Sequence, residues 1–183
     1  TSDKGRGRAG RDGFIKALEL GADVVVEMDA DRSHRPADLP RLLARLADAD
    51  LVIGSRLVAG GKDAHRAGFR VLLTKLSTAI SRTLLKLEVR DMNSGYRVYR
   101  REVLAAIDLP GLQAIGPEIV PEVLYRASRG GFRIVEEPIS FEQRAAGESN
   151  LTAGRLVRVL WFTLRLALSG KSPGTARVAR EPI

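Results

Sequence analysis

Two aspartates separated by one residue, Asp29 and Asp31, directly follow the segment 23–28, which contains a run of three valines. The run is short and rich in β-branched residues, which predicts a strand covered on both faces in a parallel sheet. In open α/β sheets, ligands bind outside the carboxyl ends of the strands. Two carboxylates there can hold one hard cation, such as Mg²⁺ or Mn²⁺, and leave positions for phosphate oxygens. The alternative is that both acids only solvate the strand end.

Basic residues stand where they could join these acids. A second buried strand is predicted over 51–53, and Arg56 follows it, so Arg56 would project from the same sheet edge and could pair with a diphosphate oxygen. Arg144 and Ser149 belong to the polar loop 143–150, which is either an anion clasp or a solvated loop.

The segment 5–10 has the G-x-G-x-x-G spacing of a dinucleotide fingerprint, but only four residues precede Gly5 and none is strand-like. What remains is a glycine-rich helix start whose N–H groups suit a phosphate, or else a flexible basic terminus. His34 and His65 lack ligand-like spacing and there is no Cys, so no zinc site is expected.

The elements that must position these residues alternate between helix and strand. Helical periodicity is found at 9–20, 36–46, 67–87, 118–129 and 151–168, and extended segments are predicted at 96–99, 132–136 and 139–141. The helix between the first two strands forms a right-handed crossover, which places those strands parallel in one sheet. The expected fold class is α/β, with a mostly parallel sheet flanked by helices.

Composition limits the class of protein. The chain has 183 residues, 30 Lys and Arg against 22 Asp and Glu, a net charge of +8 and no Cys. This describes one globular domain and excludes a disulfide scaffold. No run reaches the roughly 18 apolar residues of a membrane span, and the first residues do not form a secretory leader. The positive charge suits nucleic acid, an anionic membrane or phosphorylated small molecules. Few aromatic residues and no recognisable motif disfavour nucleic acid.

The C-terminal part differs from the rest. Trp161 and Phe162 lie among arginines in the amphipathic segment 151–168, which is typical of a helix in a membrane interface, although packing on the core is the alternative. Basic residues near anionic lipid add about 1 kcal/mol each. The expected organisation is a partial α/β domain at 1–150, an amphipathic helix at 151–170 and a disordered basic tail at 171–183.

Several collinear segments resemble the family-2 glycosyltransferases, in particular the dolichol-phosphate mannosyltransferase (polyprenol monophosphomannose synthase) group. The matching segments are 24–31, 33–40, 50–56, 91–100 and 136–141, followed by Arg144, Gly147 and Ser149. The resemblance implies a GT-A-like, Rossmann-related domain that binds a nucleotide sugar, usually GDP-mannose, through Mg²⁺ or Mn²⁺. The family's N-terminal strands, with a Pro-x-x-Asn-Glu segment and an Asp-rich loop, are not found, so the chain is expected to be N-terminally truncated.

The resemblance also implies roles for single residues. Asp29, Ala30 and Asp31 would bind the donor, and the metal would lie at Asp29, Asp31 and Ser33, where the family often has Gln in place of serine. Arg56, Arg144 and Ser149 would contact donor or acceptor phosphates, with Asp31 and Arg56 as the catalytic residues. The family's Lys after the serine is Asn150 here.

The expected reaction is a direct displacement that inverts the anomeric carbon. A polyprenyl or dolichyl phosphate oxygen attacks the sugar while the metal and arginines stabilise the leaving diphosphate. The acceptor is already anionic, so Asp91 is an optional base at most. The enzyme is expected at the cytoplasmic face of the membrane, as a peripheral protein. The alternative is a catalytically incomplete fragment that binds a membrane or a partner.

Overall fold

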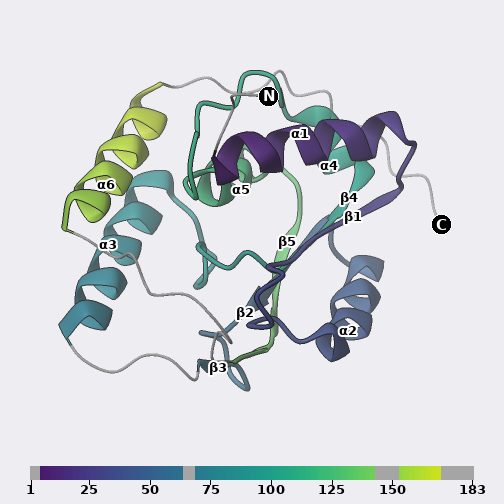
Figure 1. The fold of residues 1–183 in the computed structure, drawn as a ribbon, viewed down its shortest axis with the longest axis horizontal. Coiled ribbons are helices and arrows are strands. Elements are labelled where there is room, and N and C mark those ends of the chain that lie inside the picture. Colours follow the sequence, from purple (N-terminus) through teal and green to yellow (C-terminus); the bar gives the residue numbers. More distant parts are fainter. Residues whose placement is uncertain (1–4, 64–68, 143–152, 170–183) are drawn as a thin grey trace.

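A four-stranded sheet forms the centre of the computed structural model, which describes residues 5–63, 69–142 and 153–169 (Figure 1). Its strands are β1 (Val24–Glu27), β2 (Leu51–Ser55), β4 (Arg97–Arg100) and β5 (Ile134–Pro138), in the order β1-β4-β2-β5. Strand β4 runs antiparallel to β1 and β2, whereas β2 and β5 are parallel. Three of these four strands therefore share one direction, which confirms the expected α/β class with a mostly parallel sheet.

The first two strands are parallel as expected, but they are not neighbours. Helix α2 (Leu39–Ala44) connects them, and β4 lies between them, so that Tyr99 is opposite both Val25 and Leu51. All five residues of β2 are buried, which confirms the prediction for that strand. The prediction of two covered faces was wrong for β1. It lies at the edge of the sheet in the described residues, and none of its four residues is buried.

Side chains of β2 alternate between two hydrophobic clusters, because successive residues of a strand point to opposite faces. Leu51 and Ile53 join a large cluster under α1 (Arg6–Glu19), α4 (Arg101–Ala106) and α5 (Ile119–Arg129). Val52 joins a smaller cluster with α2 on the other face. Figure 1 shows α1, α4 and α5 on one side of the strands and α2 on the other. The sheet is thus the middle layer of the fold.

Two long helices, α3 (Phe69–Leu85) and α6 (Ala153–Leu168), pack side by side at one end of the molecule (Figure 1). The hydroxyl oxygens of Ser81 and Thr163 are 3.3 Å apart across this contact. Both helices were predicted, and α6 is amphipathic as expected. Among the described residues, no helix has the length and apolar character needed to cross a membrane.

A small parallel sheet joins β3 (Lys62–Asp63) to β6 (Ser140–Phe141). Strand β6 follows β5 directly, so this sheet lies beyond the carboxyl end of the main one. Phe141 also forms an antiparallel bridge with His34. The small sheet therefore brings the end of the described 69–142 segment to the loop after β1.

Candidate active site

Strands β1 and β2 run in the same direction, so the residues that follow them meet at one edge of the sheet. Asp29 and Asp31 follow β1, and Arg56 follows β2. This arrangement confirms the expectation that these elements deliver their polar side chains to the same end. Arg144, Ser149 and Asn150 lie outside the described residues, as do His65 and the tail 171–183.

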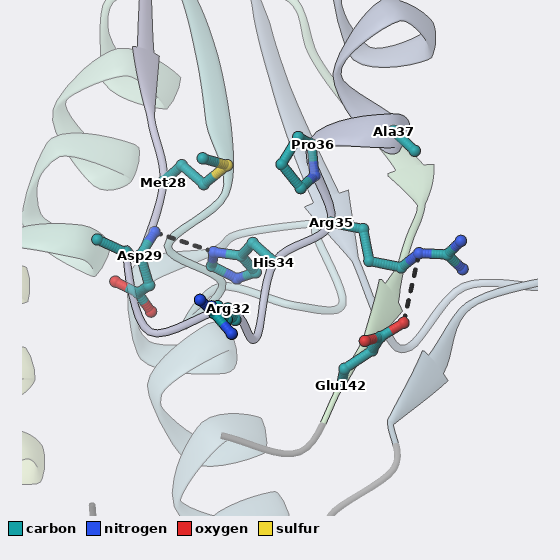
Figure 2. Close-up of a pocket in the computed structure, with 9 residues that line it drawn as sticks. Met28, Asp29, Arg32, His34, Arg35, Pro36, Ala37 and Glu142 are labelled. Carbon is teal, nitrogen blue, oxygen red and sulfur yellow. Dashed lines mark hydrogen bonds and ion pairs between the residues drawn. The ribbon is translucent and has the colours of Figure 1, made fainter. Parts of the chain in front are cut away.

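Asp29 is held from two directions. Its carboxylate Oδ1 lies 2.8 Å from Nη2 of Arg6, which belongs to the first turn of α1. Its backbone N–H donates a hydrogen bond to Nδ1 of His34 over 3.1 Å (Figure 2). Gly95 lies against the same pair, since a Cβ there would be 2.5 Å from Arg6 Nη2. Three separate segments therefore converge on this carboxylate.

Asp31 is oriented by Ser33. The backbone N–H and the hydroxyl of Ser33 both donate to Oδ1 of Asp31, over 3.0 and 2.5 Å. Ser33 is fully buried. Its hydroxyl proton is thus engaged with the Asp31 carboxylate, and the two hydrogen bonds fix the orientation of Asp31.

His34 belongs to the site, although the sequence predicted no role for it and no zinc site. It is 3% exposed and stacks on Tyr96, with ring centroids 5.0 Å apart, while Phe141 meets it edge-on at 5.3 Å. Burial lowers the pKa of His34, although the charge of Asp29 opposes the shift. Because Nδ1 accepts the backbone N–H of Asp29, the ring is assigned as the neutral tautomer with its proton on Nε2. The motif Ser33-His34-Arg35-Pro36 was the signal that could have found it.

A pocket of about 440 Å³ opens beside these residues. It is lined by Met28, Asp29, Ala30, Arg32, His34, Arg35, Pro36, Ala37 and Glu142. Figure 2 shows Asp29 and His34 on one side of it and Arg35 with Glu142 on the other. Arg35 Nε and Glu142 Oε1 are 3.4 Å apart and join the loop after β1 to the residue after β6. The pocket contains Asp29 and Ala30 of the predicted donor site.

Arg56 forms a bidentate ion pair with Asp91. Its Nε and Nη2 each lie 2.7 Å from a carboxylate oxygen of Asp91, and its backbone N–H donates to Oδ2 over 3.1 Å. The two side chains are 9% and 2% exposed. The guanidinium also lies 4.9 Å from the ring centroid of Phe141. Burial would lower the pKa of Arg56, but the hydrogen bonds and charge of Asp91 outweigh it and raise that pKa.

The turn that carries Asp91 is anchored to the sheet edge. The carboxylate of Glu136 accepts hydrogen bonds from the backbone N–H groups of Arg90 and Asp91, over 2.7 and 2.9 Å. The hydroxyl of Ser94 donates to the carbonyl of Gly54. These contacts fix the Asp91 carboxylate beneath Arg56, so the described geometry gives Asp91 the role of a partner for the arginine.

The glycine-rich start of α1 serves close packing. The N–H of Gly7 donates to the carbonyl of Ile115 over 2.9 Å, and a Cβ on Gly7 would lie 2.5 Å from the carbonyl oxygen of Ala114. That backbone N–H is therefore already used within the protein. Residues between α4 and α5 therefore lie at the glycine-rich helix start, where a phosphate was one expected ligand.

The donor atoms at the loop after β1 fit a hard divalent cation. Mg²⁺ is usually held by one or two carboxylates together with substrate phosphates, and Asp29 and Asp31 supply two. No cluster of three or more acidic, histidine or cysteine side chains suited to a metal is found in 5–63, 69–142 and 153–169. Within those residues, Asp29 and Asp31 are therefore a two-carboxylate set, which leaves coordination positions for waters or phosphate oxygens.

Comparison with known proteins identifies the family. Residues 4–108 match the family described as glycosyl transferase family 2. Undecaprenyl-phosphate mannosyltransferase of Micrococcus luteus is 41% identical, with 95% of this chain and 72% of that protein covered. Polyprenol monophosphomannose synthase of Mycolicibacterium smegmatis is 39% identical, over 98% and 68%. Dolichol-phosphate mannosyltransferase of Pyrococcus furiosus is 34% identical, over 91% and 46%.

Solved structures support the fold. Glucosyl-3-phosphoglycerate synthase from Mycobacterium tuberculosis in complex with phosphoglyceric acid superposes with a TM-score of 0.60 at 20% identity. The match covers 92% of this chain and 56% of that one. The same enzyme with uridine diphosphate has a TM-score of 0.56 at 18% identity, over 91% and 55%. This chain spans about half the length of that enzyme, and the likeness confirms the expected GT-A-like fold.

Proposed function

The chain belongs to glycosyl transferase family 2, and from that premise we propose that it transfers mannose from GDP-mannose to a polyprenyl phosphate. One observation carries the proposal: two carboxylates follow β1 beside a pocket, in a chain 41% identical to an undecaprenyl-phosphate mannosyltransferase. The names of these relatives refer to undecaprenyl phosphate, polyprenol and dolichol phosphate. The shared acceptor chemistry is a phosphate on a long isoprenoid chain.

The donor diphosphate would lie at the loop after β1. Asp29 and Asp31 would hold Mg²⁺ or Mn²⁺, and Ser33 would keep Asp31 in position through its two hydrogen bonds. When bound, the cation would neutralise charge on the leaving diphosphate. Ala30, between the two acids, lines the pocket and would contact the donor.

Positive side chains would complete the phosphate site. Arg56 carries its charge to the same sheet edge, and its ion pair with Asp91 fixes the position of the guanidinium. We propose Arg56 as a catalytic group because of this position and its motif. Arg144 and Ser149, which follow β6 in the sequence, are proposed phosphate ligands from the motif alone.

The reaction would be a single displacement. An oxygen of the acceptor phosphate forms a bond to the anomeric carbon, and the bond from that carbon to the diphosphate oxygen breaks. The leaving GDP takes the electron pair, and the configuration inverts. The acceptor oxygen is already ionised near neutral pH, so no side chain has to remove a proton. Both carboxylate oxygens of Asp91 accept hydrogen bonds from Arg56, which agrees with a reaction that uses no general base.

Helices α3 and α6 would hold the site at an anionic membrane. Exposed apolar side chains recur at helical spacing on both: Leu76, Ile80 and Leu84 on α3, and Val157, Trp161, Leu164 and Leu168 on α6. Arg158 and Arg165 are exposed on α6 as well. Small polar side chains, in contrast, are buried on these helices: Ser77, Ser81 and Thr163, of which Ser81 and Thr163 meet between the helices.

This distribution, with large apolar groups outside and small residues between helices, is typical of helices that contact lipid. Because α6 packs on α3, the membrane-binding unit would contain both helices rather than α6 alone. This unit would bind anionic lipid, because the exposed arginines of α6 favour negatively charged headgroups. Peripheral attachment would bring the pocket to the lipid-linked acceptor.

A transfer assay tests the function. The protein is incubated with GDP-mannose labelled in the sugar, polyprenyl phosphate vesicles and Mn²⁺, and label in the organic phase is counted. We expect lipid-linked mannose to form. Its formation should be lost with chelator and in Asp31→Asn. A parallel assay uses UDP-glucose as the donor. Transfer of glucose but not mannose would overturn the sugar assignment, and no transfer from either donor would favour the incomplete membrane-binding fragment.

A further inference from the structure

Arg6 and Asp29 meet at a junction of three segments. Arg6 comes from the first turn of α1, Asp29 from the end of β1, and Gly95 from the turn before β4. Nη2 of Arg6 is 2.8 Å from Oδ1 of Asp29. A Cβ at Gly95 would lie 2.5 Å from that nitrogen and 3.4 Å from Oδ1. The absence of a side chain at Gly95 thus leaves room for the ion pair.

The positive charge of Arg6 lies in the first turn of α1, at the end of a helix where positive charge is unfavourable. The N-terminus of an α-helix carries partial positive charge, so cations are unfavourable there. The first turn of α1 contains no acidic residue, and its N-cap, Gly5, supplies no side-chain hydrogen bond. Asp29 is therefore the neutralising partner that the structure provides for Arg6.

We propose that Arg6 is the resident counterion of Asp29 and competes with the divalent cation for that carboxylate. The inference rests on the proposed function, because it assumes that Asp29 is a cation ligand. A guanidinium and a divalent ion on one carboxylate repel each other, so occupancy by one opposes the other. The side chain of Arg6 is 42% exposed and that of Asp29 25%, so the ion pair is in contact with solvent and can open. Binding of the cation to Asp29 is therefore coupled to movement of the Arg6 side chain.

The test measures Mn²⁺ binding alone, without donor or activity, from the loss of the free-ion signal in electron paramagnetic resonance. Arg6→Gln should lower the dissociation constant for Mn²⁺ about fivefold, because it removes a competing charge of the surface ion-pair class. Arg6→Lys, which keeps the charge, should remain closer to the wild type. The matched control is Arg11→Gln on the same helix, since Arg11 pairs with Asp12 instead. It should change affinity less than about twofold.

Asp29→Asn separates the two ways in which the inference could fail. If Asp29→Asn loses Mn²⁺ binding but Arg6→Gln binds no more tightly than Arg11→Gln, the competition is overturned and the cation site stands. If Asp29→Asn binds Mn²⁺ as the wild type does, or no variant binds it, the cation site of the proposed function is wrong and the inference is overturned with it. Tighter binding by Arg6→Gln alone supports the competition.

Discussion

The backbone N–H of Asp29 donates a hydrogen bond to Nδ1 of His34, whose ring is enclosed by Tyr96 and Phe141. The imidazole acts here as a neutral acceptor, and it ties the first acid of the loop to a buried aromatic stack. The position of the Asp29 carboxylate therefore depends on a side chain five residues later that is almost completely buried.

Two substitutions separate the acceptor from the ring. His34→Phe keeps an aromatic group but leaves the Asp29 N–H without a partner, and we expect about tenfold weaker binding of GDP-mannose with Mn²⁺. His34→Asn removes the ring but offers an amide oxygen near the place of Nδ1, so the loss should be smaller. Calorimetric titration measures both variants. Equal affinity of His34→Phe and the wild type would show that the hydrogen bond does not position the loop.

The Arg56–Asp91 pair should contribute strongly to stability. Asp91→Asn leaves a buried guanidinium without its counter-charge, which is expected to lower the free energy of unfolding by about 3 kcal/mol. Asp12→Asn breaks the exposed pair with Arg11 and should change it by less than about 0.5 kcal/mol. Urea unfolding of the three proteins provides the comparison. Similar losses in both variants would contradict a special role for the buried pair.

Gly7 and Gly13 lie in the same helix but in different surroundings. A Cβ on Gly7 would meet backbone atoms of Ala114, Ile115 and Gly116 at 2.5 to 2.8 Å, whereas one on Gly13 would meet nothing within 4 Å. Gly7→Ala should therefore destabilise the fold by about 2 kcal/mol through overpacking. Gly13→Ala should stabilise it by about 0.5 kcal/mol or more, because alanine is the better helix former. Thermal unfolding that shows a gain for both would disprove the close packing at Gly7.

Gly95→Ala tests the Arg6–Asp29 pair without a change of charge. The added methyl group would crowd Nη2 of Arg6, which is the mobile end of a long side chain and can move away. We expect Mn²⁺ to bind more tightly than to the wild type, in the same direction as for Arg6→Gln. Weaker Mn²⁺ binding would mean that the methyl group disturbs Asp29 rather than Arg6.

Membrane attachment through α6 can be measured with vesicles. Trp161→Glu replaces an apolar side chain that is 67% exposed, and it should reduce partitioning onto vesicles with anionic lipid about tenfold or more. The control is Leu20→Glu, just after α1, where the side chain is 74% exposed; the C-terminal end of α1 points away from α6 (Figure 1). A sedimentation assay that shows equal losses would indicate a charge effect instead of a binding face.

Local patterns were enough to predict most of the elements. The apolar run of β2 and the periodicity of α3, α5 and α6 depend on neighbours within a few residues, so the sequence displays them directly. Helix α4 was missed because its six residues are too few to show a period. The two-residue strand β3 was missed for the same reason.

Contacts between distant residues could not be predicted in this way. The insertion of β4 between β1 and β2 brings together segments about 45 and 70 residues apart, and hydrophobic patterning does not specify which strands pair. Asp29 and Asp31 were located at the strand end from the sequence. The partners of Asp29 and Arg56, which are Arg6 and Asp91, depend on how α1 and the turn before β4 pack, and only the structure reveals them.

The most direct test of the central claim is calorimetric titration of the protein with GDP-mannose in the presence of Mn²⁺ and again with chelator. We predict binding that requires the metal and is lost in Asp31→Asn, while circular dichroism shows that this variant keeps the fold. Binding that is unchanged by chelator and by Asp31→Asn would contradict a donor site built on the two aspartates.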